Sequence, residues 1–313
     1  MARENRDAVV FPGQGSQRPG MGKDFYEQVS VSKETYEEAS EALGWDVAAL
    51  CFGEDERLNL TEYTQPCIVT TELAMIRGLK ALYDFSPLYF GGHSLGEFTA
   101  LVAADVLPLR DVVRIVHKRG RLMQEAVPLG RGAMSAVIGD NLDIHVILDT
   151  LKDLPIDVAN VNSAKQVVIS GEATFMSEAE SRLTAVLAKD QSVRFVALNV
   201  SAPFHSRLMA PIEESFEDTL RIFEAGMTAE NATGVTSNYT GGFHPDDKNE
   251  IIRSLVYQLS NTVKWVDNMS ELSSQADKIY EVGPGRPLRA FFQTMDVDCS
   301  SITALSAAER LFQ

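Results

Sequence analysis

The chain has 313 residues, of which 45% are hydrophobic, so it is long enough for one large α/β domain with a smaller domain attached. It carries 28 Lys and Arg against 44 Asp and Glu, and the resulting net charge of −16 argues against nucleic-acid binding. No apolar run reaches the length of a transmembrane helix, and residues 1–7 lack the apolar stretch of a secretory signal. We therefore expect a cytoplasmic protein with no membrane segment.

In chain order, apolar runs that stop at Pro or Gly predict two buried strands in the first part of the chain, at residues 8–11 and 88–90. Apolar residues at helical spacing predict helices between and after these strands. These helices are expected at residues 24–50 with a break near 43–44, 68–82, 95–104 and 107–126.

The pattern changes after Pro128, where strands and helices follow in the order strand–helix–strand–strand–helix–strand, which is the split βαβ arrangement. The expected strands are residues 133–138, 158–161, 166–170 and 194–198, and the expected helices are residues 144–151 and 175–188. This order predicts a small domain inserted at about residues 130–200, so residues 1–129 and 201–313 would form the large domain. Its later elements are expected as helices at residues 212–223 and 251–259 and strands at residues 233–237 and 278–282.

Cysteine and histidine give no sign of a metal site. The three cysteines are scattered, odd in number and without metal-type spacing, so we expect free buried thiols: Cys51, Cys67 and Cys299. The five histidines are also dispersed, with no pair at ligand spacing on one helix: His93, His117, His145, His205 and His244. We predict that the chain binds no metal.

Residues 92–96 read Gly-His-Ser-Leu-Gly and match the pattern G-x-S-x-G between a predicted strand and a predicted helix. A sharp turn there forces Ser94 into a strained backbone conformation and leaves N–H groups free at the helix start, including that of Leu95. A chance Gly/Ser loop is the alternative, and the strand–motif–helix context argues against it. We interpret Ser94 as a nucleophile.

A serine nucleophile needs a base. His205 is the best candidate, because it lies in a loop between a predicted strand and a predicted helix, where functional residues concentrate. Spacing alone favours it only modestly over His145 and His244. His93 adjoins the serine on a tight turn and would point away from it, so it is expected to pack or hydrogen-bond under the turn, and His117 falls inside a helix.

Residues 11–17, Phe-Pro-Gly-Gln-Gly-Ser-Gln, form a glycine-rich turn after the first strand. The turn lacks the Lys-Ser/Thr ending of a P-loop and does not match G-x-G-x-x-G. It is either a purely structural turn or a loop that brings its backbone and Gln14 close to the serine, and we prefer the second interpretation.

These motifs together carry a family resemblance that spans the chain from about residue 9 to about residue 288. In order and sequence, they resemble the malonyl-CoA:acyl carrier protein transacylases and the related acyltransferases of polyketide synthases. The matching segments are residues 11–17, 92–101, 119–120, 124–126, 162–163 with 166–169, 203–205 and 281–285. The resemblance implies an α/β-hydrolase-like core with a mostly parallel sheet and an inserted ferredoxin-like subdomain.

The resemblance also implies catalytic roles. Ser94 would be the nucleophile and His205 its base, and the backbone carbonyl of Gln258 would orient the histidine in place of an aspartate. The N–H groups of Gln14 and Leu95 would form the oxyanion hole.

Arg119 would bind the free carboxylate of a malonyl group, since a guanidinium holds a carboxylate through two parallel hydrogen bonds. Spacing alone would instead place this arginine on a helix surface. Gln65 would line the same pocket, and Phe204, a bulky ring before the histidine, would favour malonyl over methylmalonyl.

The implied reaction moves a malonyl group from malonyl-CoA to an acyl carrier protein, with no cofactor and with the protein acting as a monomer. Fatty acid synthesis is the first choice of pathway, and a free-standing acyltransferase of a polyketide synthase is the alternative. An acyl-thioester hydrolase and a non-catalytic carrier-binding subunit are competing interpretations. Both coenzyme A and carrier proteins are anionic, so a locally basic surface is expected on this acidic chain, unless these residues are ordinary solvated charges: Lys118, Arg119 and Arg121, and Arg286 with Arg289.

Overall fold

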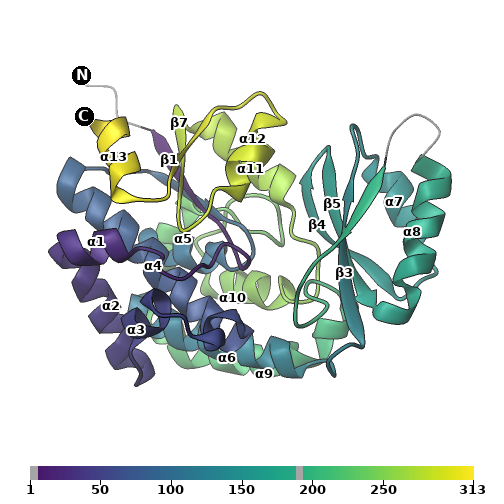
Figure 1. Cartoon of the computed structure of the whole chain (residues 1–313), viewed down its shortest axis with the longest axis horizontal. Helices are drawn as coiled ribbons and strands as arrows, with labels where there is room; N and C mark the ends of the chain where they lie inside the picture. The colour runs from purple at the N-terminus through teal and green to yellow at the C-terminus, as the bar shows by residue number, and fades with distance from the viewer. Residues whose placement is uncertain (1–5, 188–192) are drawn as a thin grey trace.

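The computed structural model describes residues 6–187 and 193–313, which form a larger and a smaller lobe (Figure 1). The larger lobe is built on a parallel four-stranded sheet in the order β2-β1-β7-β8. Its strands are β1 (Asp7–Phe11), β2 (Tyr89–Gly92), β7 (Lys278–Val282) and β8 (Cys299–Ile302). Every residue of β1 is buried, as is typical of a parallel strand covered on both faces.

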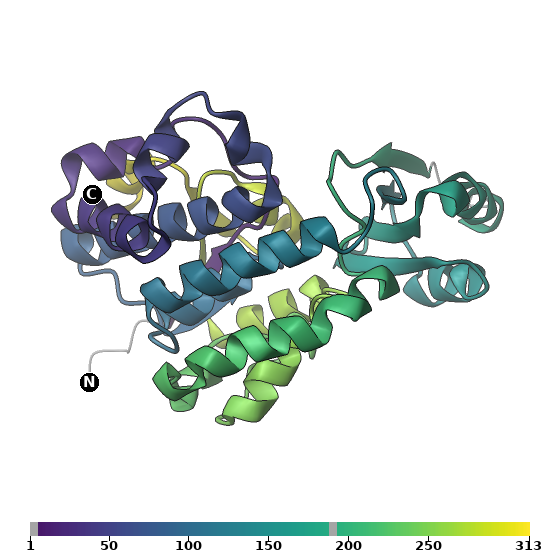
Figure 2. The ribbon, with the colours of Figure 1, turned by 90° about the horizontal axis from the view of Figure 1, so that it is seen from below.

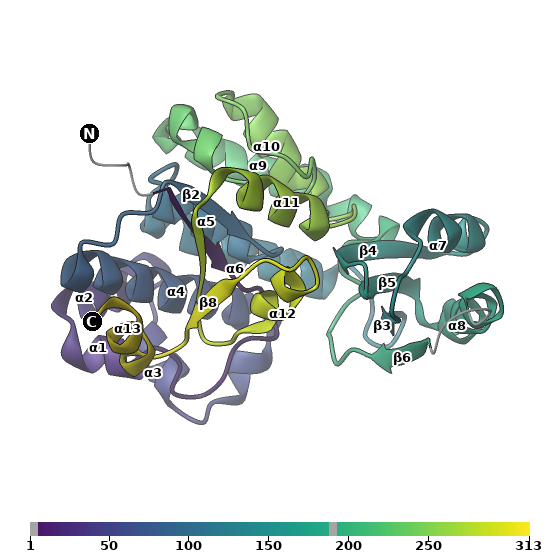
Figure 3. The same cartoon turned by 90° about the horizontal axis from the view of Figure 1, so that it is seen from above.

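Helices cover both faces of this sheet, as the view from above shows (Figure 3). Those from the first part of the chain are α1 (Lys23–Gln28), α2 (Ser30–Leu43), α3 (Val47–Phe52), α4 (Thr61–Tyr83), α5 (Gly96–Ala103) and α6 (Leu109–Glu125). Those from the last part are α9 (Glu213–Phe223), α10 (Lys248–Tyr257), α11 (Trp265–Gln275), α12 (Pro287–Gln293) and α13 (Leu305–Phe312).

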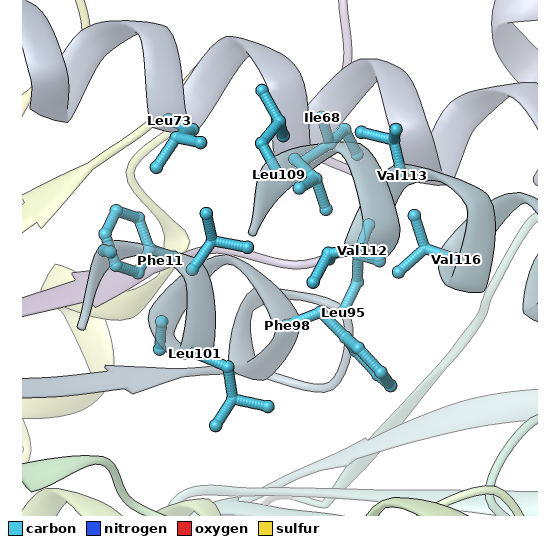
Figure 4. Packing of buried hydrophobic residues seen from close by; sticks show 14 of the residues in the cluster. Phe11, Ile68, Leu73, Leu95, Phe98, Leu101, Leu109, Val112, Val113 and Val116 are labelled. Atoms are coloured by element: carbon cyan, nitrogen blue, oxygen red, sulfur yellow. The ribbon is translucent and has the colours of Figure 1, made fainter. Parts of the chain in front are cut away.

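A dense apolar core lies where α4, α5 and α6 meet the end of β1 (Figure 4). Phe11, Phe98 and Val112 are fully buried in it, and Leu73 is 2% exposed. Truncating a buried Phe to Ala in such a core costs about 3–5 kcal/mol. The core therefore holds α5 firmly in place, and α5 begins directly after the G-x-S-x-G turn.

The smaller lobe is an antiparallel sheet in the order β4-β5-β3-β6 with two helices on one face (Figure 2). Its elements are β3 (Gly132–Ile138), α7 (Ile144–Leu151), β4 (Ile156–Ser163), β5 (Gln166–Glu172), α8 (Ala173–Leu187) and β6 (Arg194–Ala197). It has its own apolar core, which includes Val137, Ile147 and Leu183. The predicted fold class, a parallel core sheet with a small split-βαβ unit, is confirmed.

The two lobes are joined by backbone hydrogen bonds as well as by chain connections. Val161 N–H donates to Val263 O at 3.0 Å, and Val263 N–H donates to Ala159 O at 2.8 Å. The side chains of Arg207 and Asp157 form an ion pair across the same junction. We propose that residues 1–129 and 201–313 form a catalytic domain and that residues 130–200 form a subdomain.

One expected strand is wrong. Residues 233–237 do not form a strand; after the 3-10 helix Ala229–Gly234 only two isolated bridges form, Val235 with Phe90 and Thr236 with Phe243. The chain then leaves the sheet edge, because the side chain of Asn238 is bound beneath the serine turn. The elements β8, α11, α12 and α13 were not predicted at all, and α4 begins at Thr61, earlier than the expected residue 68.

None of the helices in the described part of the chain combines the length and the apolarity needed to cross a membrane. Two of the sequence predictions include residues outside the described part of the chain. The helix predicted for residues 175–188 is described up to Leu187, and of the polar stretch at residues 1–7 only residues 6–7 lie within the described residues.

Candidate active site

The G-x-S-x-G turn is a tight junction between β2 and α5 in which the glycines are sterically required. A Cβ on Gly92 would lie 1.9 Å from the carbonyl carbon of Gly96, and a Cβ on Gly96 would lie 2.1 Å from Phe11 O. Ser94, between them, has a φ of 52°, in the left-handed region that non-glycine residues rarely adopt. The turn is therefore a strained nucleophile elbow, with Ser94 at its apex.

Asn238 holds this elbow from below. Its Oδ1 accepts a 2.6 Å hydrogen bond from Ser94 N–H, and its Nδ2 donates to Gly92 O at 2.8 Å. Asn268 Oδ1 accepts a second bond from the same Nδ2, so the amide orientation is fixed. The sequence contained no local signal for this role, because Asn238 lies far along the chain, one residue beyond the expected strand at residues 233–237.

His205 is the imidazole that contacts the serine. Its Nε2 lies 2.7 Å from Ser94 Oγ, and its Nδ1 lies 2.7 Å from the backbone carbonyl of Gln258. A carbonyl only accepts, so Nδ1 carries the proton and Nε2 accepts the hydrogen bond from the serine hydroxyl. The carbonyl thus occupies the place that a carboxylate has in a Ser-His-Asp triad.

The surroundings of His205 keep the ring neutral. Burial lowers its pKa to about 3, with the positive charge of Arg119 as the next cause, while the hydrogen bond to Gln258 acts in the opposite direction. A neutral imidazole whose Nε2 lies 2.7 Å from the serine hydroxyl is arranged to accept its proton.

Arg119, on α6, is 1% exposed and is therefore not part of a basic surface. Its Nη1 donates to Gln65 Oε1 at 3.0 Å, and its Nη2 donates to Gln258 Oε1 at 2.8 Å and to Ser94 Oγ at 3.4 Å. Its guanidinium stacks on the ring of Phe98, with 5.3 Å to the centroid. Burial lowers its pKa to about 10, and a cation remains at neutral pH.

The guanidinium has donor capacity that the described protein groups do not fill. Its Nε is buried without a hydrogen-bond partner, and the bond from Nη2 to Ser94 Oγ is long. A buried donor left unpaired is costly, which favours an acceptor supplied from outside the chain. The position of Arg119 beside Ser94 puts that acceptor next to the nucleophile.

A cavity of about 730 Å³ opens onto Ser94 and His205 at the junction of the lobes. Phe204 and the loop containing Gln14 also line it. Within residues 6–187 and 193–313, the backbone N–H groups of Gln14 and Leu95 have no hydrogen-bond acceptor. Free N–H groups beside a nucleophile are suited to bind a developing oxyanion.

Four of the residues proposed for the site from the sequence line this cavity: Gln14, Ser94, Phe204 and His205. Arg119 contacts Ser94 directly, Gln258 contacts His205 directly, and Gln65 contacts Arg119.

The other histidines have separate partners. His93 Nε2 is bound to Asn162 Oδ1 at 2.7 Å, and His93 lines the same cavity. His244 Nε2 is bound to Glu97 Oε1 at 2.8 Å. His117 pairs with Glu62, and His145 is exposed on α7.

Sequence reasoning missed a second set of polar residues behind the elbow. Glu97 is fully buried and accepts hydrogen bonds from His244, from Gln258 and from the backbone of Asn238. The available signal was an acidic residue in the first turn of a helix that is otherwise mostly apolar. Such a residue indicates polar partners, since a charge is seldom buried without them. Among the described residues, no group of three His, Cys, Asp or Glu side chains is placed to hold a metal ion.

The model of the acyl transferase domain family matches residues 8–283 of the chain. A malonyl CoA-acyl carrier protein transacylase from Staphylococcus aureus is 37% identical over 309 residues, which cover 96% of each chain. The protein of the same name from Bacillus subtilis is 37% identical over 287 residues, which cover 90% of this chain and 87% of the relative.

Solved structures agree with these sequence matches. The malonyl CoA-acyl carrier protein transacylase from Clostridium perfringens superimposes with a TM-score of 0.88 at 34% identity, covering 98% of this chain and 96% of that one. A malonyl-transacylase solved in complex with a type II polyketide synthase acyl-carrier protein gives a TM-score of 0.87 at 31% identity, over 98% and 99% of the chains. The chain therefore belongs to the acyl transferase family, among the malonyl CoA-acyl carrier protein transacylases.

Proposed function

We propose that this enzyme transfers the malonyl group from malonyl-CoA to the pantetheine thiol of an acyl carrier protein, in fatty acid biosynthesis, through an ester on Ser94. The observation that carries the proposal is the buried Arg119 guanidinium, whose Nη2 lies 3.4 Å from Ser94 Oγ. A serine hydrolase of neutral esters has no use for a cation there, whereas a substrate with a terminal carboxylate needs one.

In the first half-reaction, Ser94 Oγ attacks the thioester carbonyl carbon while His205 Nε2 takes the hydroxyl proton. The carbonyl oxygen becomes an oxyanion, which the N–H groups of Gln14 and Leu95 stabilise. Collapse of this intermediate breaks the carbon–sulfur bond. Coenzyme A leaves as a thiol with the proton from His205, and malonyl-Ser94 remains.

The second half-reaction reverses these steps with a different thiol. The pantetheine thiol of the carrier protein gives its proton to His205 and attacks the ester carbonyl. The new tetrahedral intermediate then expels Ser94 Oγ, which regains a proton from His205. Malonyl carrier protein is released, and the kinetics are ping-pong.

Selectivity between acyl groups follows from three side chains of the site: Arg119, Gln65 and Phe204. The malonyl carboxylate accepts hydrogen bonds from the free donors of Arg119, and Gln65 holds the guanidinium in place. An acetyl group would leave the buried cation unpaired, which penalises its transfer. Phe204, which is 8% exposed, limits the space for an α-methyl group.

The reaction needs no resident cofactor or metal, because the thioester is supplied by coenzyme A and the accepting thiol by the carrier protein. We further propose that the enzyme acts as a monomer in the cytoplasm.

Intact-mass measurement after incubation with a panel of acyl-CoA thioesters tests the proposal. The wild-type chain is expected to gain one malonyl group, which Ser94→Ala prevents and which holo-acyl carrier protein removes as malonyl carrier protein. Rapid release of free malonate in place of a stable ester would identify a thioester hydrolase. Labelling that persists in Ser94→Ala, or stronger labelling by acetyl-CoA, would overturn the assignment of the site. Carrier proteins of the fatty-acid and polyketide types, compared as acceptors, decide between the two pathways.

A further inference from the structure

Glu97 is a buried carboxylate three residues beyond the nucleophile, and the reaction steps above do not use it. It is fully buried in the first turn of α5. Its Oε2 accepts from Gln258 Nε2 at 2.6 Å and from Asn238 N–H at 3.1 Å, and its Oε1 accepts from His244 Nε2 at 2.8 Å. Three donors converge on this one side chain, so it has a single fixed orientation.

Gln258 connects Glu97 to the catalytic groups. Its amide Nε2 donates to Glu97 and to Ser94 O at 3.0 Å, while its Oε1 accepts from Arg119 Nη2 at 2.8 Å. Its backbone carbonyl accepts from His205 Nδ1. One residue thus contacts the nucleophile, the base and the cation.

The orientation of the Gln258 amide depends on Glu97. An ionised carboxylate only accepts hydrogen bonds, so it attracts Nε2 and leaves Oε1 facing Arg119. A flipped amide would place its NH₂ group against the guanidinium, donor against donor. The carboxylate, together with Ser94 O and the guanidinium itself, therefore determines which atom of Gln258 meets the cation.

Glu97 also acts on Arg119 at a distance. Its charge raises the pKa of Arg119 and so opposes the larger lowering that burial causes. The two charged groups are separated by the Gln258 amide and form no ion pair within the described residues. A direct pair would occupy the donors that the substrate carboxylate needs, whereas the spaced arrangement supports the cation and leaves its Nε free.

We infer that Glu97 is a positioning residue for acyl selectivity: it fixes the Gln258 amide so that Arg119 presents its free donors to the carboxylate of the acyl group. The inference rests on the proposed function and identifies the residue that maintains its selectivity. A merely structural Glu97 would lower the rates with all acyl groups in parallel, so the ratio between two substrates separates the two roles.

The test compares kcat/KM for malonyl-CoA with kcat/KM for acetyl-CoA in the wild type and in Glu97→Gln. The variant side chain has nearly the same shape, but its NH₂ group replaces one oxygen and so opposes either the donors of Gln258 and Asn238 or the donor of His244. We expect the malonyl-to-acetyl ratio to fall roughly 10- to 100-fold, the range for a lost hydrogen bond to a charged group. Part of this fall should appear as a higher KM for malonyl-CoA, because the binding of its carboxylate is weakened.

Glu72→Gln is the control, since it makes the same substitution at another fully buried glutamate of the same lobe, one whose pKa burial raises well above its ordinary value. Glu72 accepts a 2.6 Å hydrogen bond from Thr99 Oγ1, and none of its described hydrogen bonds reaches Gln258. This control should keep the wild-type ratio. An unchanged ratio in Glu97→Gln, or an equal fall in both variants, overturns the inference.

Thermal unfolding of each variant shows whether it is folded. If Glu97→Gln does not fold, Gln258→Met is measured instead, because it interrupts the same connection to Arg119 and keeps the backbone carbonyl for His205. A wild-type ratio in Gln258→Met contradicts the inference. A wild-type enzyme that shows no preference for malonyl-CoA contradicts the proposed function itself, so the two failures are distinguishable.

Discussion

Ser94 and His205 meet through two backbone positions that both lie in the left-handed region, with φ values of 52° and 56°, and their Oγ and Nε2 atoms are 2.7 Å apart. Such conformations cost about 1–3 kcal/mol each for non-glycine residues and persist only where the surrounding structure determines them. Here Ser94 N–H is bound to Asn238 and His205 N–H to Leu259 O at 3.1 Å. The fold therefore places the nucleophile and the base in contact.

Replacing His205 by Ala should lower the rate of malonyl-Ser94 formation by about 10²–10⁴-fold, the usual contribution of a general base. Rapid-quench measurement of the first turnover isolates this step from product release. His145→Ala is the control, because that histidine is exposed on α7, and it should have no effect. A His205→Ala variant that acylates at the wild-type rate would remove the imidazole from the mechanism.

On the acid side, kcat/KM should begin to fall only at a pH well below the ordinary pKa of histidine. The imidazole of His205 must be unprotonated to accept a proton, and its pKa is lowered to about 3, so lowering the pH does not disable it until far below neutrality. We expect kcat/KM, which reports on the free enzyme, to stay level between about pH 8 and about pH 5. A fall centred near pH 6.5, the ordinary value for histidine, would show that burial and Arg119 do not control the base.

As the pH is lowered, kcat should begin to fall at a higher pH than kcat/KM does. The substrate carboxylate partly offsets the charge of Arg119, which is one cause of the low pKa of His205. Binding of malonyl-CoA thus raises that pKa in the complex, which kcat reports. Measuring kcat and kcat/KM over the same pH series checks which of them falls first, and a fall of both at the same pH would argue against a carboxylate at Arg119.

Arg119→Lys should strongly reduce kcat/KM for malonyl-CoA and should have only a small effect on protein stability. Lysine keeps a positive charge, but its point-like ammonium cannot reproduce the contacts of the planar guanidinium to Gln65, to Gln258 and to a bound carboxylate. We expect a loss of at least about 10-fold. Arg121→Lys, at an exposed position of the same helix, is the control. Equal kinetics in the two variants would show that a charge alone is sufficient.

Gly92→Ala should disrupt the elbow, because the added Cβ would lie 1.9 Å from the backbone of Gly96. Overpacking of this kind typically costs about 1–3 kcal/mol, and here the displaced atoms carry the nucleophile. Both the melting temperature and the acylation rate should fall. Gly242→Ala adds the same methyl group where no atom lies within 4 Å, and it should behave as wild type. A Gly92→Ala enzyme with normal stability and rate would contradict the described geometry.

The sequence by itself determined the elements that have strong local signals. The run at residues 8–11 is apolar and ends at Pro-Gly, and it is strand β1; the order of elements in the smaller lobe followed from alternating strand and helix patterns. The nucleophile elbow was visible because its glycines are local steric requirements. By contrast, β8 was missed because it is short and has two serines at its centre, and α12 because it is only seven residues long.

Only the tertiary structure decided which polar groups meet. Spacing along the chain favoured a surface position for Arg119, yet α4 and α5 bury it against Gln65 and Phe98. The contacts of Asn238 and Glu97 join segments more than 140 residues apart. Periodicity reports which face of an element is buried, but a buried polar residue is stabilised by partners that arrive from other elements, and the chain crossings that bring them together have no local signature.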